Sequence, residues 1–177
     1  MKKIIALAII SITSLSACEK SGPEPTEGPN LHPAAYEETS PEITGILIKK
    51  ADREMVLVSH GRRMRYYNVD LGFEPEGDKR IQGDGRTPEG TYRINRKNPQ
   101  SNFFLSIGLD YPNARDIAEA RALGKAPGGD IFIHGQGRWG RNRSGTDWTE
   151  GCIAITDDEM KEVFRLVQIG TPVTILP

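Results

Sequence analysis

The chain has 177 residues, with 23 basic and 24 acidic side chains and a formal net charge of −1. This length is typical of one domain, and the balanced charge shows no basic footprint for nucleic-acid binding. Hydrophobic residues make up 37% of the chain, which is enough for a core once an unfolded tail is set aside.

Residues 1–17 are typical of a secretory signal. A basic start, Met1–Lys3, precedes an apolar run from Ile4 to Ile12, which is short for a membrane span. Small and polar residues follow up to Cys18. We therefore expect a signal peptide and exclude it from the fold. A short transmembrane anchor is the alternative.

The end of this signal, Leu15-Ser16-Ala17-Cys18, resembles the bacterial lipobox. The resemblance implies cleavage before Cys18 and its lipidation, and more than one acyl chain gives firm anchoring. Glu19 follows, which by the usual bacterial sorting rule implies the outer membrane, on its periplasmic face. A lipidated Cys18 leaves Cys152 without a disulfide partner in the chain.

A proline-rich segment comes next. Residues 18–42 have no apolar period, so we expect a flexible tether that begins with the lipidated cysteine. Its prolines are Pro23, Pro25, Pro29, Pro33 and Pro41. The folded domain is expected over residues 43–177.

Short apolar runs bounded by turn residues predict β-strands in this domain. They cover residues 43–48, 55–60, 64–69, 91–94, 103–107, 130–134, 152–155 and 173–176. A helix is expected over 114–123, and a second begins at Thr156, which forms a capping box with Glu159. The expected fold is mostly β with two or more short helices, as a β-sandwich or partly open barrel.

A histidine and a cysteine lie at the ends of two of these apolar runs. His134 ends one run and is followed by Gly135, while Cys152 lies eighteen residues later and is preceded by Gly151. A cysteine beside a histidine can be held as a thiolate with a lowered pKa, and nearby backbone N–H groups could bind an oxyanion. The pair therefore fits acyl transfer by a cysteine nucleophile. A buried, inert cysteine is the alternative.

A metal site is the competing chemistry for such a pair. It needs three or four ligands, but the chain has only His32, His60 and His134, and His32 lies in the expected tether. His60 is expected to cap a strand end. We therefore expect no bound metal.

Two motifs in the chain point to a known family. Ile133-His134-Gly135 is followed by a loop and then by Thr149-Glu150-Gly151-Cys152-Ile153, and the segment from Gly83 to Tyr92 reads Gly-Asp-x-x-Thr-Pro-x-Gly with an aromatic residue after it. This order resembles the catalytic signature of L,D-transpeptidases with a YkuD-type domain, in particular a subgroup of single-domain periplasmic proteins. The resemblance extends over about residues 43–177.

The resemblance implies a substrate and a mechanism. Cys152 would attack the carbonyl between the L-centre of meso-diaminopimelate and D-Ala in a peptidoglycan stem tetrapeptide. His134 would protonate the leaving D-Ala and then act as base while the thioester passes to an acceptor amine. No metal or organic cofactor is implied. The implied partners are peptidoglycan stem peptides, with the major outer-membrane lipoprotein as a further candidate.

Two positions depart from the better-studied members. Glu150 stands where many have His, and Ala154 where many have Arg. The acceptor therefore stays open between a diaminopimelate amine, a lysine amine, a free D-amino acid and water. With water, the chain would be an L,D-carboxypeptidase or an amidase that releases peptidoglycan-bound lipoprotein. An inactive, wall-binding lipoprotein is the alternative outside catalysis.

The loop between the two catalytic motifs holds the remaining candidates for substrate binding. Arginine suits bidentate carboxylate contacts, so Arg138, Arg141 and Arg143 are candidates for reading the carboxylates of diaminopimelate or D-Ala. Trp139 and Trp148 could form an aromatic wall for the stem peptide. A solvated loop and ordinary packing are the respective alternatives.

Several residues are expected to shape the site without reacting. Gly135 and Gly151 satisfy tight turns, and Thr149 matches the family's Ser/Thr, which implies support of the catalytic backbone. Three residues of the upstream motif are expected to hold a turn beneath the site: Asp84, Thr87 and Gly90.

Overall fold

The computed structural model describes residues 40–140, 143 and 145–177. The expected signal peptide, the lipidation site Cys18 and nearly all of the tether lie outside these residues, so those expectations stay predictions. Within the described part, no helix is both long enough and apolar enough to cross a membrane.

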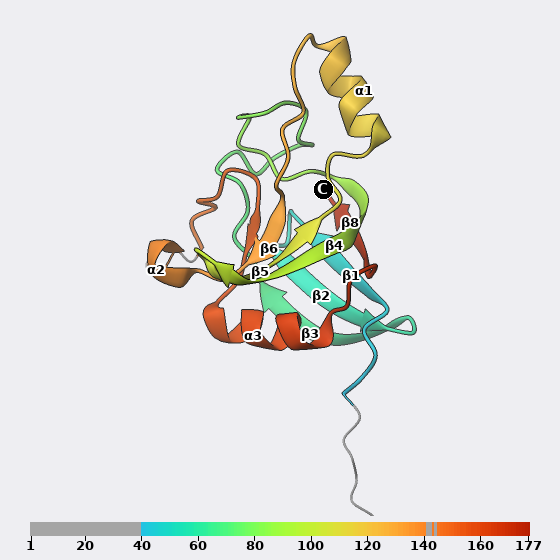
Figure 1. Ribbon diagram of the computed structural model, residues 1–177, viewed down its shortest axis with the longest axis vertical. Coiled ribbons are helices and arrows are strands. Elements are labelled where there is room, and N and C mark those ends of the chain that lie inside the picture. The colour runs from blue at the N-terminus through green and yellow to red at the C-terminus, as the bar shows by residue number, and fades with distance from the viewer. Residues whose placement is uncertain (1–39, 141–142, 144) are drawn as a thin grey trace, which may run out of the picture. The chain divides into compact units, whose positions relative to one another are not determined.

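The domain is built on one mixed sheet with short helices, and the expectation of a mostly-β fold is confirmed (Figure 1). The strands are β1 (Gly45–Lys49), β2 (Glu54–Ser59), β3 (Arg62–Asn68), β4 (Gly90–Ser101), β5 (Phe104–Leu109), β6 (Phe132–His134), β7 (Ile153–Ala154) and β8 (Pro172–Leu176). The helices are α1 (Ala114–Ala122), α2 (Gly137–Gly140) and α3 (Asp157–Leu166). The single turn of α2 falls in a segment expected to be loop.

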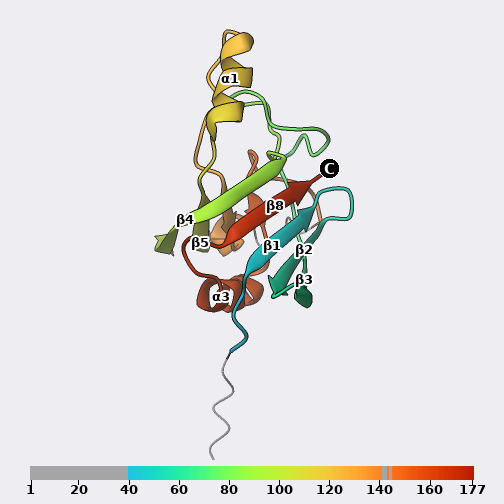
Figure 2. The ribbon, with the colours of Figure 1, turned by 90° about the vertical axis from the view of Figure 1, so that its right-hand side faces the viewer.

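The sheet has the order β3-β2-β1-β8-β4-β5-β6-β7. Figure 2 shows β8 between β1 and β4. The pairs β1–β8 and β6–β7 are parallel, and the others are antiparallel. A bridge between Asp70, just after β3, and Ala154 in β7 links the two ends of the sheet. The sheet is thus a single open one whose ends are joined by that bridge.

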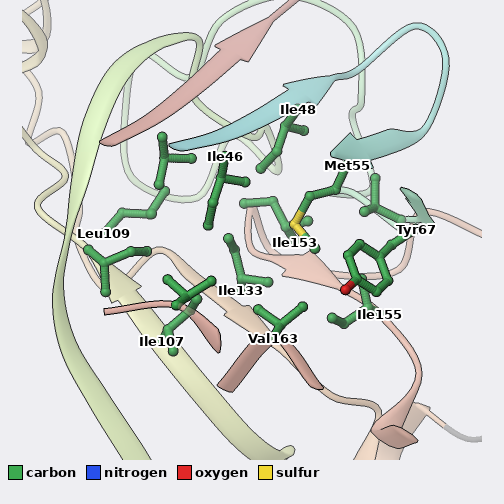
Figure 3. Packing of buried hydrophobic residues seen from close by; sticks show 14 of the residues in the cluster. Ile46, Ile48, Met55, Tyr67, Ile107, Leu109, Ile133, Ile153, Ile155 and Val163 are labelled. Carbon is green, nitrogen blue, oxygen red and sulfur yellow. The ribbon is translucent and has the colours of Figure 1, made fainter. Parts of the chain in front are cut away.

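Alternating side chains explain how the strands enclose a core. In β1, Ile46 and Ile48 are buried between partly exposed neighbours, as the two-residue period of a strand requires. They face Ile133 of β6, Ile153 of β7 and Val163 of α3 across the interior (Figure 3). Full burial of one such side chain stabilises the fold by about 1.5–3 kcal/mol.

The helix α3 follows β7 in the chain and begins at a capping box. The expected capping box is confirmed, because Thr156 accepts a hydrogen bond from the Glu159 N–H and the Glu159 side chain accepts one from the Thr156 N–H. The buried residues Met160, Val163 and Leu166 lie on one side of the helix. This face packs into the core against β5.

Candidate active site

The pairing of β6 with β7 brings the histidine and the cysteine together. The register aligns Ile133 with Ile153 and His134 with Ala154. Because side chains alternate, the buried Ile133 and Ile153 face the core, and His134 faces the other side together with Cys152. The two residues therefore lie on one face, about 6–7 Å apart along the strand direction.

Both side chains line the same cavity, which has a volume of about 750 Å³. They also line a smaller cavity of about 300 Å³, whose other walls are mostly Asn, Gln and Ser side chains of the β4–β5 region. The sequence-based prediction that these two residues share a site is consistent with this placement. The pair stands where the two cavities meet.

The environment of His134 selects its protonation state. Its side chain is buried, and Nδ1 lies 2.6 Å from the carbonyl oxygen of Gly135. A carbonyl oxygen can only accept, so Nδ1 donates and Nε2 of the neutral ring is left as the basic atom. Burial lowers the pKa of His134 below its ordinary value, and the hydrogen bond to Gly135 offsets only part of this effect. The imidazole is therefore neutral at pH 7.

Two aromatic rings hold the imidazole of His134 in place. The Phe103 ring is 4.6 Å away between centroids and tilted by 31°, and the Trp148 ring is 5.8 Å away in an edge-on arrangement. Phe103 comes from the β4–β5 turn, and sequence reasoning placed it only in a strand. Its sole signal in the sequence is an apolar residue at the tip of a hairpin.

The thiol of Cys152 is protonated in this environment. Burial raises its pKa to about 11, which outweighs the opposing hydrogen bond from the Phe132 N–H. The Sγ–H group contacts the carbonyl oxygen of Asp130 at 3.5 Å. The raised pKa is opposite in direction to the lowered pKa that a neighbouring histidine led us to expect. Burial of the sulfur, which the motif does not encode, is the reason.

The turn before the cysteine is tied together by Thr149. Its Oγ1 donates to the Cys152 carbonyl oxygen at 2.7 Å and accepts from the Gly151 N–H at 3.1 Å. Gly151 has φ +126°, and a Cβ there would lie 2.6 Å from the Arg86 carbonyl oxygen. These contacts agree with the expected supporting role of Thr149 and with the backbone role of Gly151.

A carboxylate at the start of α3 secures the segment after the histidine. Asp157 Oδ1 accepts hydrogen bonds from the N–H groups of Gln136 at 2.7 Å and Gly137 at 2.9 Å. A Cβ on Gly135 would approach the same oxygen to 2.6 Å. Sequence reasoning used Thr156 and Glu159 as caps and missed Asp157, although an acidic residue in a first helical turn was a visible signal.

The upstream motif forms the turn that was expected beneath the site. Asp84 accepts hydrogen bonds from the Lys79 ammonium group and from the backbone N–H groups of Arg80, Ile81 and Arg86. Burial alone would raise the pKa of Asp84, but these hydrogen bonds outweigh it and lower the pKa.

The other two members of this motif connect the turn to the sheet. Thr87 is fully buried, and its hydroxyl accepts from the Gly72 N–H at 3.1 Å. Gly72 is bridged in turn to Thr149. Gly90 begins β4 with φ +129°, a conformation that suits glycine. The motif is thereby joined to the turn that carries Cys152.

The loop candidates divide into those that line the large cavity and those that do not. Trp139, Trp148 and Arg143 line it. The guanidinium of Arg138 lies over the Trp139 ring at 4.8 Å instead. Arg141 lies outside the described residues. In the part of the chain that the structure covers, no three His, Cys, Asp or Glu side chains gather as a metal site would require.

Comparison with known families identifies this arrangement. Residues 43–175 match the model of the YkuD family, described as the L,D-transpeptidase catalytic domain. The protein YafK of Escherichia coli (strain K12), which carries the provisional name L,D-transpeptidase, is 33% identical over 93 residues, or 51% of this chain and 32% of its own length.

Solved structures share the fold. Pgp2 from Campylobacter jejuni, described as a helical cell shape determining protein, is 28% identical with a TM-score of 0.60, and the match covers 77% of this chain and 48% of that chain. Bd1075 from Bdellovibrio bacteriovorus is 22% identical with a TM-score of 0.57, covering 79% and 50%. The chain thus spans half or less of the length of each of these relatives.

Proposed function

Because the chain belongs to the YkuD family of L,D-transpeptidase catalytic domains, we propose that it is a cysteine-dependent acyltransferase that acts on peptidoglycan stem tetrapeptides. The observation that carries this proposal is the placement of His134 and Cys152 on one face of β6 and β7, in one cavity, with Nε2 of the neutral imidazole left as a base.

In the first step, the Cys152 sulfur attacks the carbonyl carbon between diaminopimelate and D-Ala while its proton moves to Nε2 of His134. The backbone N–H of Gly151 already donates to Thr149, so the N–H of Cys152 itself is the candidate donor to the oxyanion. The carbon–nitrogen bond then breaks, and His134 gives the proton to the departing amine of D-Ala. A thioester on Cys152 is left.

In the second step, an acceptor attacks the thioester carbon. His134 takes a proton from the acceptor, the carbon–sulfur bond breaks, and the proton returns to the sulfur. A diaminopimelate amine would give a cross-link, a lysine amine an attached lipoprotein, and a D-amino acid an exchanged stem peptide. The chemistry needs only groups that the chain and its substrates supply.

Hydrolysis is the second candidate function, and one observation favours it. The small cavity next to His134 and Cys152 is lined mostly by Asn, Gln and Ser side chains, which can hold a water molecule by hydrogen bonds. With water as acceptor the chain would act as an L,D-carboxypeptidase, or as an amidase that releases peptidoglycan-bound lipoprotein. An inactive wall-binding protein is the third reading, which Cys152-dependent release of D-Ala from a stem tetrapeptide would exclude.

We also propose where the protein works. The lipobox-like segment supports lipidation of Cys18 and anchoring at the periplasmic face of the outer membrane. A domain tethered there by residues 18–42 would reach the adjacent peptidoglycan. The similarity to Pgp2 adds a role in cell shape to this proposal.

Muropeptide mass spectrometry tests the function. The purified chain and a Cys152→Ala control are incubated with peptidoglycan sacculi that carry bound lipoprotein. New diaminopimelate–diaminopimelate links or D-amino-acid exchange products would establish transfer. Tripeptides without new links, or loss of the lipoprotein remnant, would establish hydrolysis. Identical products from both proteins would overturn the proposal.

A further inference from the structure

A buried lysine lines the large cavity. Lys79 is only 4% exposed, yet it belongs to the wall of the cavity that holds His134 and Cys152. Its Nζ donates to Asp84 Oδ1 at 2.8 Å and to the Ile81 carbonyl oxygen at 3.2 Å. An ammonium group has three N–H donors, so one is left for a group inside the cavity.

The walls around Lys79 leave room for a ligand. Gly83 and Gly85 line the cavity near the lysine, and Gly128 and Gly129 line it from the segment before β6. A Cβ built on Gly83 or Gly129 would meet nothing within 4 Å. A Cβ on Gly85 would instead collide with the Phe73 ring, so the open part of the wall is the one beside Gly83 and Gly129.

The charge of the ammonium group also acts on the reacting sulfur. Burial is the dominant influence on the pKa of the Cys152 thiol and raises it, but the positive charge of Lys79 is among the effects that lower it. Lys79 and Arg143 are the two cationic residues on the described wall of this cavity. Arg143 is exposed, so Lys79 is the cation that a substrate would meet away from bulk water.

Resting on the proposed function, we propose that Lys79 binds the terminal carboxylate of the departing D-Ala and so selects donors that end at this residue. In the scissile unit, the carboxylate lies one residue beyond the attacked carbonyl, and consecutive Cα atoms are about 3.8 Å apart. A longer stem peptide would place a neutral amide at that position. The lysine would then lose a charge-assisted hydrogen bond, which is stronger than a neutral one.

A second buried lysine shows what a purely structural role would look like. Lys50 is 2% exposed, donates to Glu89 Oε1 at 2.8 Å and to the Thr87 carbonyl oxygen at 3.0 Å, and holds the same upstream segment. It lines neither cavity that contains the catalytic pair. Lys50 is therefore a matched control for the loss of a buried ion pair.

The test compares two donors that differ only in the terminal group. A disaccharide tetrapeptide and its C-terminal D-alaninamide form are turned over by the wild-type chain, Lys79→Gln, Lys79→Arg and Lys50→Gln. Release of D-Ala or D-alaninamide is followed by mass spectrometry, which reads the first step whatever the acceptor is. We expect the wild type to prefer the acid by about tenfold or more in kcat/KM.

The ratio of kcat/KM for the acid donor to kcat/KM for the amide donor should fall to near one in Lys79→Gln. It should be partly retained in Lys79→Arg and unchanged from wild type in Lys50→Gln. Equal use of both donors by the wild type would overturn the role of Lys79 while leaving the proposed function intact. A preference retained in Lys79→Gln would overturn it as well. If Lys79→Gln fails to fold, the role of Lys79 is judged from the acid-to-amide ratio of the wild type and of Lys79→Arg. An equal ratio in these two proteins would then overturn it. No release from either donor by the wild type would instead refute the proposed function.

Discussion

The raised pKa of Cys152 leads to a test of how the nucleophile is generated. With a pKa of about 11, about one thiol in 10⁴ is ionised at pH 7, against a few per cent for an ordinary cysteine. The higher nucleophilicity of a more basic thiolate recovers part of this difference. Alkylation of Cys152 by iodoacetamide should therefore be about 10–100-fold slower than that of a free cysteine at pH 7.

The pH dependence of this labelling gives the sharper result. Below the pKa of the thiol, the labelling rate should rise about tenfold per pH unit, because only the thiolate reacts. We expect this rise to continue from pH 6 to pH 9 without a plateau, as measured by intact-mass spectrometry. A His134→Gln variant should show nearly the same profile, because no ion pair exists to be lost.

Turnover of the donor should behave differently from alkylation. Here the neutral imidazole takes the thiol proton during attack, so the rate depends on His134 being unprotonated. Because burial lowers the pKa of His134, the rate of the first step should be flat above neutral pH and should fall in acid with an apparent pKa below the ~6.5 of an ordinary histidine. If Cys152 is alkylated rapidly at pH 6 and the rate is constant through neutral pH, then the thiol is already ionised. That result would refute the conclusion that His134 is neutral and Cys152 is protonated before substrate binds.

Three substitutions near the nucleophile probe how its turn and its neighbours are held. Thr149→Val removes both hydrogen bonds of the hydroxyl and should lower kcat by at least about tenfold, whereas Thr149→Ser should retain most activity. Gly151→Ala forces a Cβ against a backbone carbonyl at positive φ and should reduce the free energy of unfolding by about 1–3 kcal/mol, measured by urea denaturation. A urea midpoint of Gly151→Ala equal to that of the wild type would contradict this destabilisation. Asp157→Ala leaves two backbone N–H groups unpaired and should destabilise by about 1–3 kcal/mol, with Asp157→Asn closer to wild type.

The sequence was most informative where structure depends on local pattern. The strand over residues 43–48 and the capping box at Thr156 depend on residues a few positions apart, and both are seen as expected. The fold class and the family followed from such patterns and from two motifs. The placement of His134 at the end of β6 and of Cys152 just before β7 then required only the register of these two strands.

The contacts that sequence reasoning missed join residues far apart in the chain. Phe103 reaches His134 from a different hairpin, and Asp157 reaches Gln136 from the following helix. Lys79 lines the cavity only because the upstream turn lies against the segment that carries Cys152. No local period encodes these approaches. The pKa of the Cys152 thiol depends on the same packing. The motif alone therefore predicted a lowered pKa, whereas burial raises it.

A protonated thiol also resolves a difficulty raised by the proposed location. In an oxidising compartment a lone cysteine is exposed to disulfide exchange and oxidation, and the thiolate is the form that reacts. A pKa of about 11 keeps that form scarce until a substrate is bound. The neutral His134, with Nε2 available, then supplies the base at the moment of attack. Burial would thus protect Cys152 between turnovers, and the catalytic step would depend on the imidazole rather than on a standing thiolate.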